Sequence, residues 1–336
     1  MKPTMRAKPP RSKRQPNFDA TPSGNKLSNR LATEMANVAA YVESGLASNT
    51  MRAYASDLRH FKHWGGRIPA TPSTVARYLV ECAKTLKVST IARHMAAIAR
   101  EHNRLGLQPP TQSAVVRATM RGIRRIHGCS QKQAKPITSA MIRSLVTPIA
   151  HFSELRNSRD RALLLLGFSG GFRRSELANL TVNDLSFEKR GLVVHLRTAK
   201  TDQNGFGRDI AILNGNEPVC PVKALKEWIK HLQYNYCEND NSGVIFRKID
   251  RFDRIAGGLS GAGINWILRT RMQAKRMDVD GFSAHSLRAG LVSSAAMAGV
   301  PIWEIQRQTG HRSESMVHRY IRNVGLFDSN VSSRIF

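Results

Sequence analysis

The sequence has no long apolar run, few cysteines and few acidic residues for its length of 336 residues. Its longest apolar stretch, Ala162 to Phe168, is far shorter than the roughly 18 residues that a transmembrane helix needs. The N-terminus is basic but lacks the apolar segment of a secretory signal. We therefore expect a protein that neither spans a membrane nor is secreted.

The four cysteines, Cys82, Cys129, Cys220 and Cys237, lie far apart, and none belongs to a C-x-x-C pair. Such pairs are typical of zinc sites, whereas dense cysteine patterns are typical of secreted disulfide frameworks. The spacing therefore predicts no metal site and no disulfide framework. Reduced cysteines fit a cytoplasmic location.

Acidic residues are scarce, since 24 Asp and Glu stand against 52 Lys and Arg, a formal net charge of +28. A charge of this size indicates a polyanionic partner, most often nucleic acid. Residues 1–135 carry 24 basic and 6 acidic residues, and residues 136–336 carry 28 and 18. Two basic halves suit a protein that encloses a DNA duplex from two sides. Ribosomal and packaging proteins are also basic, so the motifs must decide the function.

The composition changes along the chain. Residues 1–30 hold eight basic residues and one acid among Pro, Ser and Asn, which predicts a flexible arm that either contacts phosphates or only adds solubility. Residues 31–127 carry apolar residues at helical spacing, which predicts a bundle of four or five helices. Residues 128–136 are polar and end in proline, as a linker does. Residues 137–336 then form a second domain with a C-terminal tail.

The second domain mixes helical patterns with a few strands. Residues 191–197 and 208–213 read as paired strands, and Asn204-Gly205 between them favours a tight turn. Helical patterns precede and follow this region. The fold class that we expect is mainly α with a small antiparallel β-sheet, built as a helical bundle followed by an α+β domain.

Two motifs pair a charged or polar side chain with an arginine at helical spacing. In G-G-F-R-R-S-E-L, Arg173 and Glu176 share one face of a helix, an arrangement that is by itself most often a surface ion pair. In H-S-L-R, His285 lies over Arg288, so both can donate to one phosphate. Each pair alone is a weak signal.

Three single residues complete the set. Lys200 lies in T-A-K-T-D-Q at the edge of the predicted hairpin, where most lysines are merely solvated. His311 follows a glycine in T-G-H, and Tyr320 comes nine residues later in a predicted helix, where a tyrosine is usually a core residue. None of the three would be singled out on its own.

Together, and in this order, these residues supply every group needed to break a phosphodiester without a metal ion. Two guanidinium groups can hold the non-bridging oxygens and stabilise the charge of the transition state. A lysine can protonate the leaving oxygen, and imidazoles can add hydrogen bonds and move protons. A tyrosine hydroxyl can attack phosphorus and form a covalent phosphotyrosine.

With this set the sequence resembles the tyrosine recombinases of the phage integrase family, and most of all the Cre-like enzymes, over roughly residues 45–325. The resemblance implies a helical core-binding domain followed by an α+β catalytic domain. Lys189 is an alternative to Lys200, since loops shift in register. The implied catalytic residues are Arg173 with its supporting acid Glu176, Lys200, His285, Arg288, His311 and the nucleophile Tyr320.

The first domain resembles the family's core-binding domain. Its segments S-N-T-M-R-A-Y and S-T-I-A-R-H-M are similar to the two helices that enter the major groove, which makes Arg52, Arg93 and His94 candidate DNA contacts. Arg121 and Arg125 are expected on phosphates, because long basic side chains on exposed helices mostly contact the DNA backbone. Residues 257–263 are glycine-rich where Cre-like enzymes have a base-contacting side chain, so the target sequence cannot be carried over.

The resemblance implies a site-specific recombinase that acts on double-stranded DNA with a specific target site. The tyrosine joins the 3′ phosphate, a 5′ hydroxyl is released, and four identical protomers on two sites exchange strands through a Holliday junction. One phosphoester replaces another, so no cofactor is expected. The setting implied is the cytoplasm and nucleoid of a bacterium or of a mobile element's host.

Two other functions remain open at this stage. One is a DNA-binding protein without catalysis, such as a repressor or packaging factor, although binding alone needs neither Tyr320 nor His311. The other is a type IB topoisomerase-like enzyme, which shares the phosphotyrosine chemistry but relaxes supercoils without a partner site. The tail beyond Tyr320 either docks on a neighbouring subunit or frays. Its apolar residues are Leu326, Phe327, Val331, Ile335 and Phe336.

Overall fold

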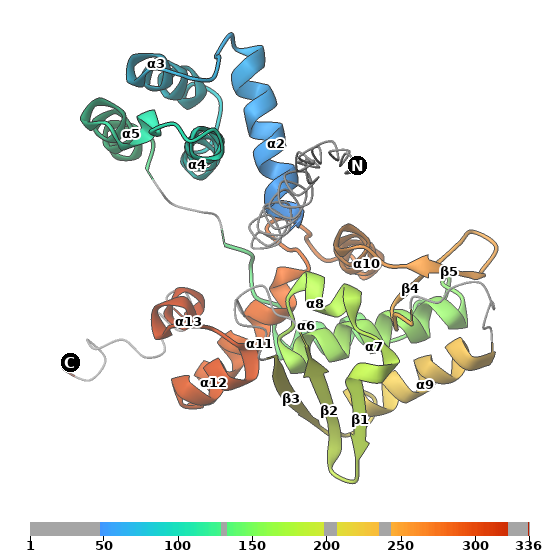
Figure 1. Cartoon of the computed structure of the whole chain (residues 1–336). Coiled ribbons are helices and arrows are strands. Elements are labelled where there is room, and N and C mark those ends of the chain that lie inside the picture. The colour runs from blue at the N-terminus through green and yellow to red at the C-terminus, as the bar shows by residue number, and fades with distance from the viewer. Residues whose placement is uncertain (1–47, 129–132, 198–206, 235–242, 322–334, 336) are drawn as a thin grey trace, which may run out of the picture. The chain divides into compact units, whose positions relative to one another are not determined.

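The chain divides into two compact units, residues 1–130 and residues 131–336 (Figure 1). No helix within the described part of the chain is long and apolar enough to cross a membrane. The predicted arm and most of the C-terminal tail lie outside the described residues. The computed structural model describes residues 48–128, 133–197, 207–234, 243–321 and 335.

The described part of the first unit consists of helices and the loops that connect them. Hydroxyl side chains begin two of its helices: Thr71 accepts a hydrogen bond from the backbone N–H of Thr74, and Ser113 accepts one from Val116. Between the helices lies a core of residues such as Phe61 and Ile98. The helices are α2 (Ser48–His63), α3 (Pro72–Ala83), α4 (Val88–Arg104), the 3₁₀ turn η1 (Pro110–Gln112) and α5 (Ala114–His127).

The second unit is mainly helical, with two small antiparallel sheets. The expected fold class is confirmed. Its helices are α6 (Ser139–Val146), α7 (Glu154–Gly170), α8 (Arg174–Asn179), η2 (Val182–Asp184), α9 (Pro221–Tyr234), α10 (Gly261–Ala274), α11 (His285–Met297), α12 (Ile302–Thr309) and α13 (Glu314–Ile321). Its strands are β1 (Leu185–Glu188), β2 (Gly191–Leu196), β3 (Arg208–Leu213), β4 (Arg247–Ile249) and β5 (Ile255–Gly258).

The larger sheet has the order β1-β2-β3. Strands β2 and β3 are the predicted antiparallel pair, in a register that sets Leu192 opposite Ile212 and His195 opposite Asp209. The predicted turn at Asn204-Gly205 and Lys200 lie outside the described residues. Strands β1, β4 and β5 were not predicted, because three or four residues are too short for an alternating pattern to emerge.

Helix α7 is the centre of the second core. Its residues Ala162 to Leu166 are all buried, since α6, α9 and α11 pack around it. A separate small cluster of Val292, Ile305 and Val317 joins α11, α12 and α13, which lie together at the C-terminal end of the described chain (Figure 1). The ends of these helices and of α7 therefore meet in one place.

The segment before α6 is part of the second unit. The backbone N–H of Lys135 donates to the carbonyl of Gly281 at 2.9 Å, and that of Ile137 donates to the carbonyl of Ser286 at 3.1 Å. These bonds attach residues 135–137 to the loop before α11 and to the first turn of α11. Residues 129–132 lie outside the described part of the chain, and the linker expected over residues 128–136 stays a prediction.

Candidate active site

Three arginines meet at the C-terminal end of helix α12. Gly310 closes this helix in the left-handed conformation that favours glycine, and the last carbonyls of the helix have no partners within it. A cation placed there is stabilised by these carbonyls and by the helix dipole. The bonds run from Arg208 Nη1 to the Gln308 carbonyl at 3.0 Å, from Arg288 Nη1 to the Thr309 carbonyl at 2.6 Å and from Arg173 Nη2 to the Gly310 carbonyl at 3.1 Å.

Arg288 lies at the centre of this arrangement. Its side chain is only 1% exposed, and its Nη1 also donates to the carbonyl of Gly171 at 2.6 Å. Gly171 ends α7 in the left-handed conformation, and a Cβ there would lie 2.8 Å from Leu291. Two helix ends closed by glycine thus direct carbonyl oxygens at one guanidinium.

Glu176 is the carboxylate of the cluster. Its side chain, on α8, accepts from Arg173 through Nη1 at 2.6 Å and through the backbone N–H at 2.8 Å. Arg208 Nη2 donates to the same carboxylate at 3.1 Å. Glu176 thereby binds two arginines from different elements, and its role as a supporting acid in catalysis stays a prediction.

The positive charge of the arginines in this cluster exceeds the negative charge of its one carboxylate. Three arginines against one glutamate leave a charge of +2 in a region where Arg288 and Glu176 are buried. Burial, followed by the charge of Arg173, lowers the pKa of Arg288 to about 10. Within the described residues, Arg288 Nη2 and Arg208 Nε are buried without a hydrogen-bond partner. Unpaired buried donors of this kind call for an anion.

His311 lies at the edge of the cluster, and one of its ring nitrogens is held by a hydrogen bond. Thr309 Oγ1 lies 2.5 Å from the carbonyl of Ile305, to which it donates its proton. The Nδ1–H of His311 therefore donates to this Oγ1 at 2.7 Å, which leaves Nε2 as an acceptor in the neutral ring. Burial and the arginines lower the pKa of His311 to about 3, so the ring is neutral.

Tyr320 meets His285 at the opening of the site. Its hydroxyl oxygen lies 2.6 Å from His285 Nε2, and its ring centroid lies 5.5 Å from that of His311. The ring packs on the small core of α11, α12 and α13. Desolvation and the charges of Arg288 and Arg173 lower the pKa of His285. A neutral imidazole in this position can accept the proton of the tyrosine hydroxyl.

The structure brings together six of the seven catalytic residues that the sequence predicted. Arg173 and Glu176 come from α8 and its start, His285 and Arg288 from α11, His311 from the turn after α12, and Tyr320 from α13. The seventh, Lys200, lies outside the described residues, and so does its surrounding loop.

Arg208 is the residue of this site that the sequence reasoning missed. It begins β3 on the same face as the buried Ile210 and Ile212. Burial lowers its pKa, and Glu176 opposes this shift. The sequence pattern already indicated that Arg208 is special. A charged residue on the apolar face of an alternating strand needs a buried partner.

The DNA-binding candidates of the first unit separate into exposed and buried residues. Arg52, Arg121 and Arg125 are exposed on α2 and α5, where they can contact DNA. Arg93 is half-exposed and forms a two-bond ion pair with Asp57 at 2.8 and 2.9 Å. His94 is only 4% exposed, with its ring nitrogens held by Tyr78 and Asp57, so its expected place on a DNA-facing surface is wrong.

Two family models cover most of the chain. Residues 113–324 match the phage integrase family, and residues 40–103 match the N-terminal SAM-like domain of phage integrases. The first match alone spans more than half of the sequence. It contains every residue of the candidate active site.

Curated relatives cover similar lengths. The chain is 34% identical over 305 residues to an integrase/recombinase XerD homolog of Selenomonas ruminantium, covering 88% of this chain and 87% of the relative. It is 27% identical over 275 residues to the recombinase Cre of Escherichia phage P1, covering 76% and 77%. The expected resemblance to this family is confirmed.

Solved structures share the fold at low sequence identity. The XerH site-specific recombinase bound to a palindromic difH substrate aligns with a TM-score of 0.61 at 15% identity, over 81% of this chain and 75% of that one. A lambda integrase dimer bound to a core site aligns with a TM-score of 0.58 at 15% identity, over 90% and 81%. The chain belongs to the phage integrase family, the tyrosine recombinases, which carry out site-specific DNA recombination.

Proposed function

We propose that Tyr320 is the nucleophile of this recombinase and that Arg173, Arg288 and His311 hold the scissile phosphate. The observation that carries the proposal is the buried cluster with a charge of +2, two unpartnered guanidinium nitrogens and the Tyr320 hydroxyl at its opening. A phosphodiester supplies the anionic oxygens that such donors need. The same donors stabilise the extra negative charge of a pentacoordinate transition state.

The cleavage step transfers one phosphoester bond to the protein. Tyr320 Oη attacks phosphorus while its proton passes to His285 Nε2, 2.6 Å away. The bond from phosphorus to the 5′ oxygen breaks, and a 3′-phosphotyrosine forms. The leaving oxygen takes a proton from Lys200, whose role rests on the family resemblance. Attack by a 5′ hydroxyl from the partner DNA reverses each step.

His311 gains a role when the phosphate is bound. In the neutral ring its Nε2 carries no proton, because Nδ1–H donates to Thr309. A phosphate oxygen next to this nitrogen favours protonation, since an adjacent anion stabilises the imidazolium. Protonated His311 then donates to a non-bridging oxygen beside the arginines. Binding of the scissile phosphate thus takes up a proton at this position.

DNA is the partner of both units in this proposal. The exposed Arg52, Arg121 and Arg125 of the first unit neutralise backbone phosphates of a specific duplex target, assisted by Arg93. Four protomers assemble on two target sites and exchange strands through a Holliday junction. XerH and lambda integrase were solved in complexes with DNA, which supports a DNA partner for this relative.

A covalent-adduct assay tests the nucleophile. Wild-type protein and Tyr320→Phe are incubated with duplex DNA from around the gene, and SDS-resistant adducts are resolved and sequenced. We expect adducts only with wild type, while DNA binding is kept, because the phenyl ring packs as before but has no attacking oxygen. Tyr54→Phe in α2 is the matched control and should keep the adduct. Adducts with Tyr320→Phe would disprove the assignment.

The same fragments separate recombination from the topoisomerase alternative. Two duplexes of different length that carry the trapped site are incubated together with wild type. Recombination predicts joined products of the two recombinant lengths, whereas a type IB topoisomerase-like enzyme would relax supercoiled DNA and leave linear duplexes unjoined. Binding without any adduct would favour a DNA-binding protein that does not cleave.

A further inference from the structure

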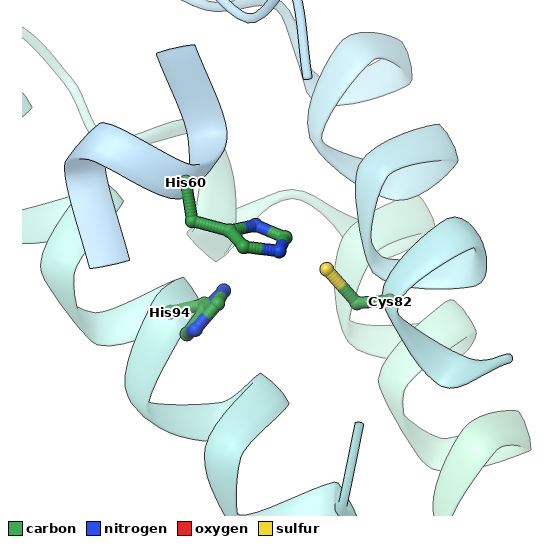
Figure 2. Close-up of side chains that lie close together, drawn as sticks. All are labelled: His60, Cys82 and His94. Atoms are coloured by element: carbon green, nitrogen blue, oxygen red, sulfur yellow. The ribbon is translucent and has the colours of Figure 1, made fainter. Parts of the chain in front are cut away.

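A second cluster of chemically active side chains lies in the first unit. His60 of α2, Cys82 of α3 and His94 of α4 each offer one metal-ligating atom, and these atoms all lie within 4.8 Å of one another (Figure 2). It is the one such group within the described residues. Its members belong to a different unit from the catalytic residues, and the recombination chemistry uses none of them.

The donor atoms match one class of metal. A thiolate and two imidazoles are the ligands of Zn²⁺, which binds sulfur at about 2.3 Å and nitrogen at about 2.0–2.1 Å. In a tetrahedral site these bond lengths put ligand atoms about 3.3–3.6 Å apart. The three ligating atoms, which all lie within 4.8 Å of one another, can reach this spacing by small side-chain rotations.

His94 is oriented as a metal-ligating histidine would be. Its Nε2 lies 3.0 Å from Asp57 Oδ1, and Arg93 holds the same carboxylate through two hydrogen bonds. Asp57 therefore accepts from Nε2–H, and Nδ1 keeps its lone pair toward the interior of the cluster. A carboxylate behind a histidine fixes the tautomer in many zinc sites. Burial lowers the pKa of His94, which keeps the ring neutral for binding.

The Tyr78 hydroxyl now lies among the three ligating side chains, and it also hydrogen-bonds with Cys82. Its hydroxyl oxygen is 2.8 Å from His60 Nδ1 and 2.6 Å from His94 Nδ1, and its ring is fully buried. In this arrangement the hydroxyl donates to the lone pair of His94. A metal ion would replace the hydrogen bonds that this hydroxyl makes with all three side chains, so the phenol oxygen must move aside when the ion binds.

One member of the cluster is accessible from solvent. His60 is exposed at the last turn of α2, whereas Cys82 and His94 are buried at 3% and 4% exposure. An ion can therefore bind first to His60. Burial raises the pKa of the Cys82 thiol, so binding must release its proton and will weaken as the pH falls.

We propose that His60, Cys82 and His94 form a structural Zn²⁺ site that ties α2, α3 and α4 together. The ion forms bonds to Cys82 Sγ and to one nitrogen of each histidine, the thiol proton goes to solvent, and no oxidation state changes. Since α2 and α4 carry Arg52 and Arg93, the ion would stiffen the surface that these arginines present. The sequence rule that excluded a zinc site considered only neighbouring cysteines, and these three ligands come from three helices.

Cobalt titration of the full-length, tag-free protein tests the site. Metal is removed with a chelator, and Co²⁺ is added while the absorption of the cobalt–thiolate charge-transfer band and of the visible tetrahedral bands is followed. We expect one Co²⁺ per chain with a thiolate band that Zn²⁺ abolishes by competition. Zn²⁺ should also raise the melting temperature. No thiolate band in wild type would overturn the proposal.

Matched variants assign the ligands. Cys82→Ser should lose the thiolate band, whereas Cys220→Ser, which alters a buried cysteine of the second unit, should keep it. His60→Asn should weaken Co²⁺ binding about tenfold or more, whereas His63→Asn, three residues on and also exposed, should not. His60 is exposed, so its variant folds even if Cys82→Ser does not. A band that persists in Cys82→Ser, or unchanged affinity in His60→Asn, would disprove the site.

Discussion

The two units of this protein both bury polar side chains, but they satisfy them differently. In the first unit, hydrogen bonds link His60, Tyr78, His94, Asp57 and Arg93 in one continuous chain. In the second unit, three arginines share one glutamate, and two guanidinium nitrogens remain unpartnered. All of the buried unpartnered side-chain atoms within the described residues, Ser158 Oγ included, belong to the second unit.

This difference separates a cluster that is complete as folded from one that a ligand completes. A closed set of hydrogen bonds offsets the cost of burying its members and favours a single arrangement. A buried excess of cations instead costs free energy until an anion arrives. In our proposals the second cluster binds a phosphate, and the first exchanges the hydrogen bonds of the Tyr78 hydroxyl for a metal ion.

The largest expected effect comes from Arg288, which we propose to hold the phosphate in the transition state. Arg288→Lys keeps one positive charge but removes the planar group that reaches two helix ends. We expect covalent-adduct formation to fall on the order of a thousandfold while DNA affinity changes little. Single-turnover cleavage and equilibrium binding measure the two quantities. Equal losses in both would make Arg288 a simple phosphate anchor.

The next effect concerns Arg208, which touches Glu176 and the end of α12. Arg208→Gln removes its ion pair and its support of the Gln308 carbonyl. We expect cleavage to fall about tenfold to a hundredfold, mostly in the chemical step, because Arg173 loses its fixed partner geometry. Arg197→Gln, which alters an exposed arginine at the end of β2, is the matched control. A change in DNA affinity alone would show that Arg208 acts only through charge.

The sequence predicted the residues whose partners are close in the chain. Arg173 with Glu176 and His285 with Arg288 are each three residues apart, so helical geometry alone sets them together. Arg208 was missed because its partners are Glu176 and a carbonyl a hundred residues away. The apolar face of β3 indicates that Arg208 needs a buried partner, but no local pattern identifies which residue that partner is.

His94 shows how adjacent residues can be confused. Arg93 and His94 were both expected on the DNA-facing surface, but only Arg93 points outward. His94 lies three residues after Ile91 and four before Ile98, both of which are fully packed in the core. Helical spacing therefore sets His94 on the buried face, a conclusion that the apolar pattern already contained. The hydrogen bond that the buried ring needs is supplied by the hydroxyl of Tyr78, on another helix.

A smaller effect is expected when the closed cluster is opened. Tyr78→Phe removes the hydroxyl that joins the two imidazoles and leaves their Nδ1 atoms without this partner. We expect the first unit to lose about 1–3 kcal/mol of stability, with no change in the rate of cleavage once DNA is bound. Urea denaturation and single-turnover cleavage test the two statements. An unchanged stability would mean that the cluster is held by packing alone.

The smallest effect is the pH dependence that His311 adds to the free protein. Its pKa is lowered to about 3 in the folded state, against about 6.5 when unfolded, so the unfolded chain binds the proton more readily. The contribution of His311 to the free energy of unfolding is therefore fully present above about pH 6.5 and is lost as the pH falls toward 3. Between pH 7 and pH 5 the loss is at most about 2 kcal/mol. Urea denaturation of wild type and His311→Gln measures the difference in slope, and equal slopes would show that His311 is not buried neutral among the arginines.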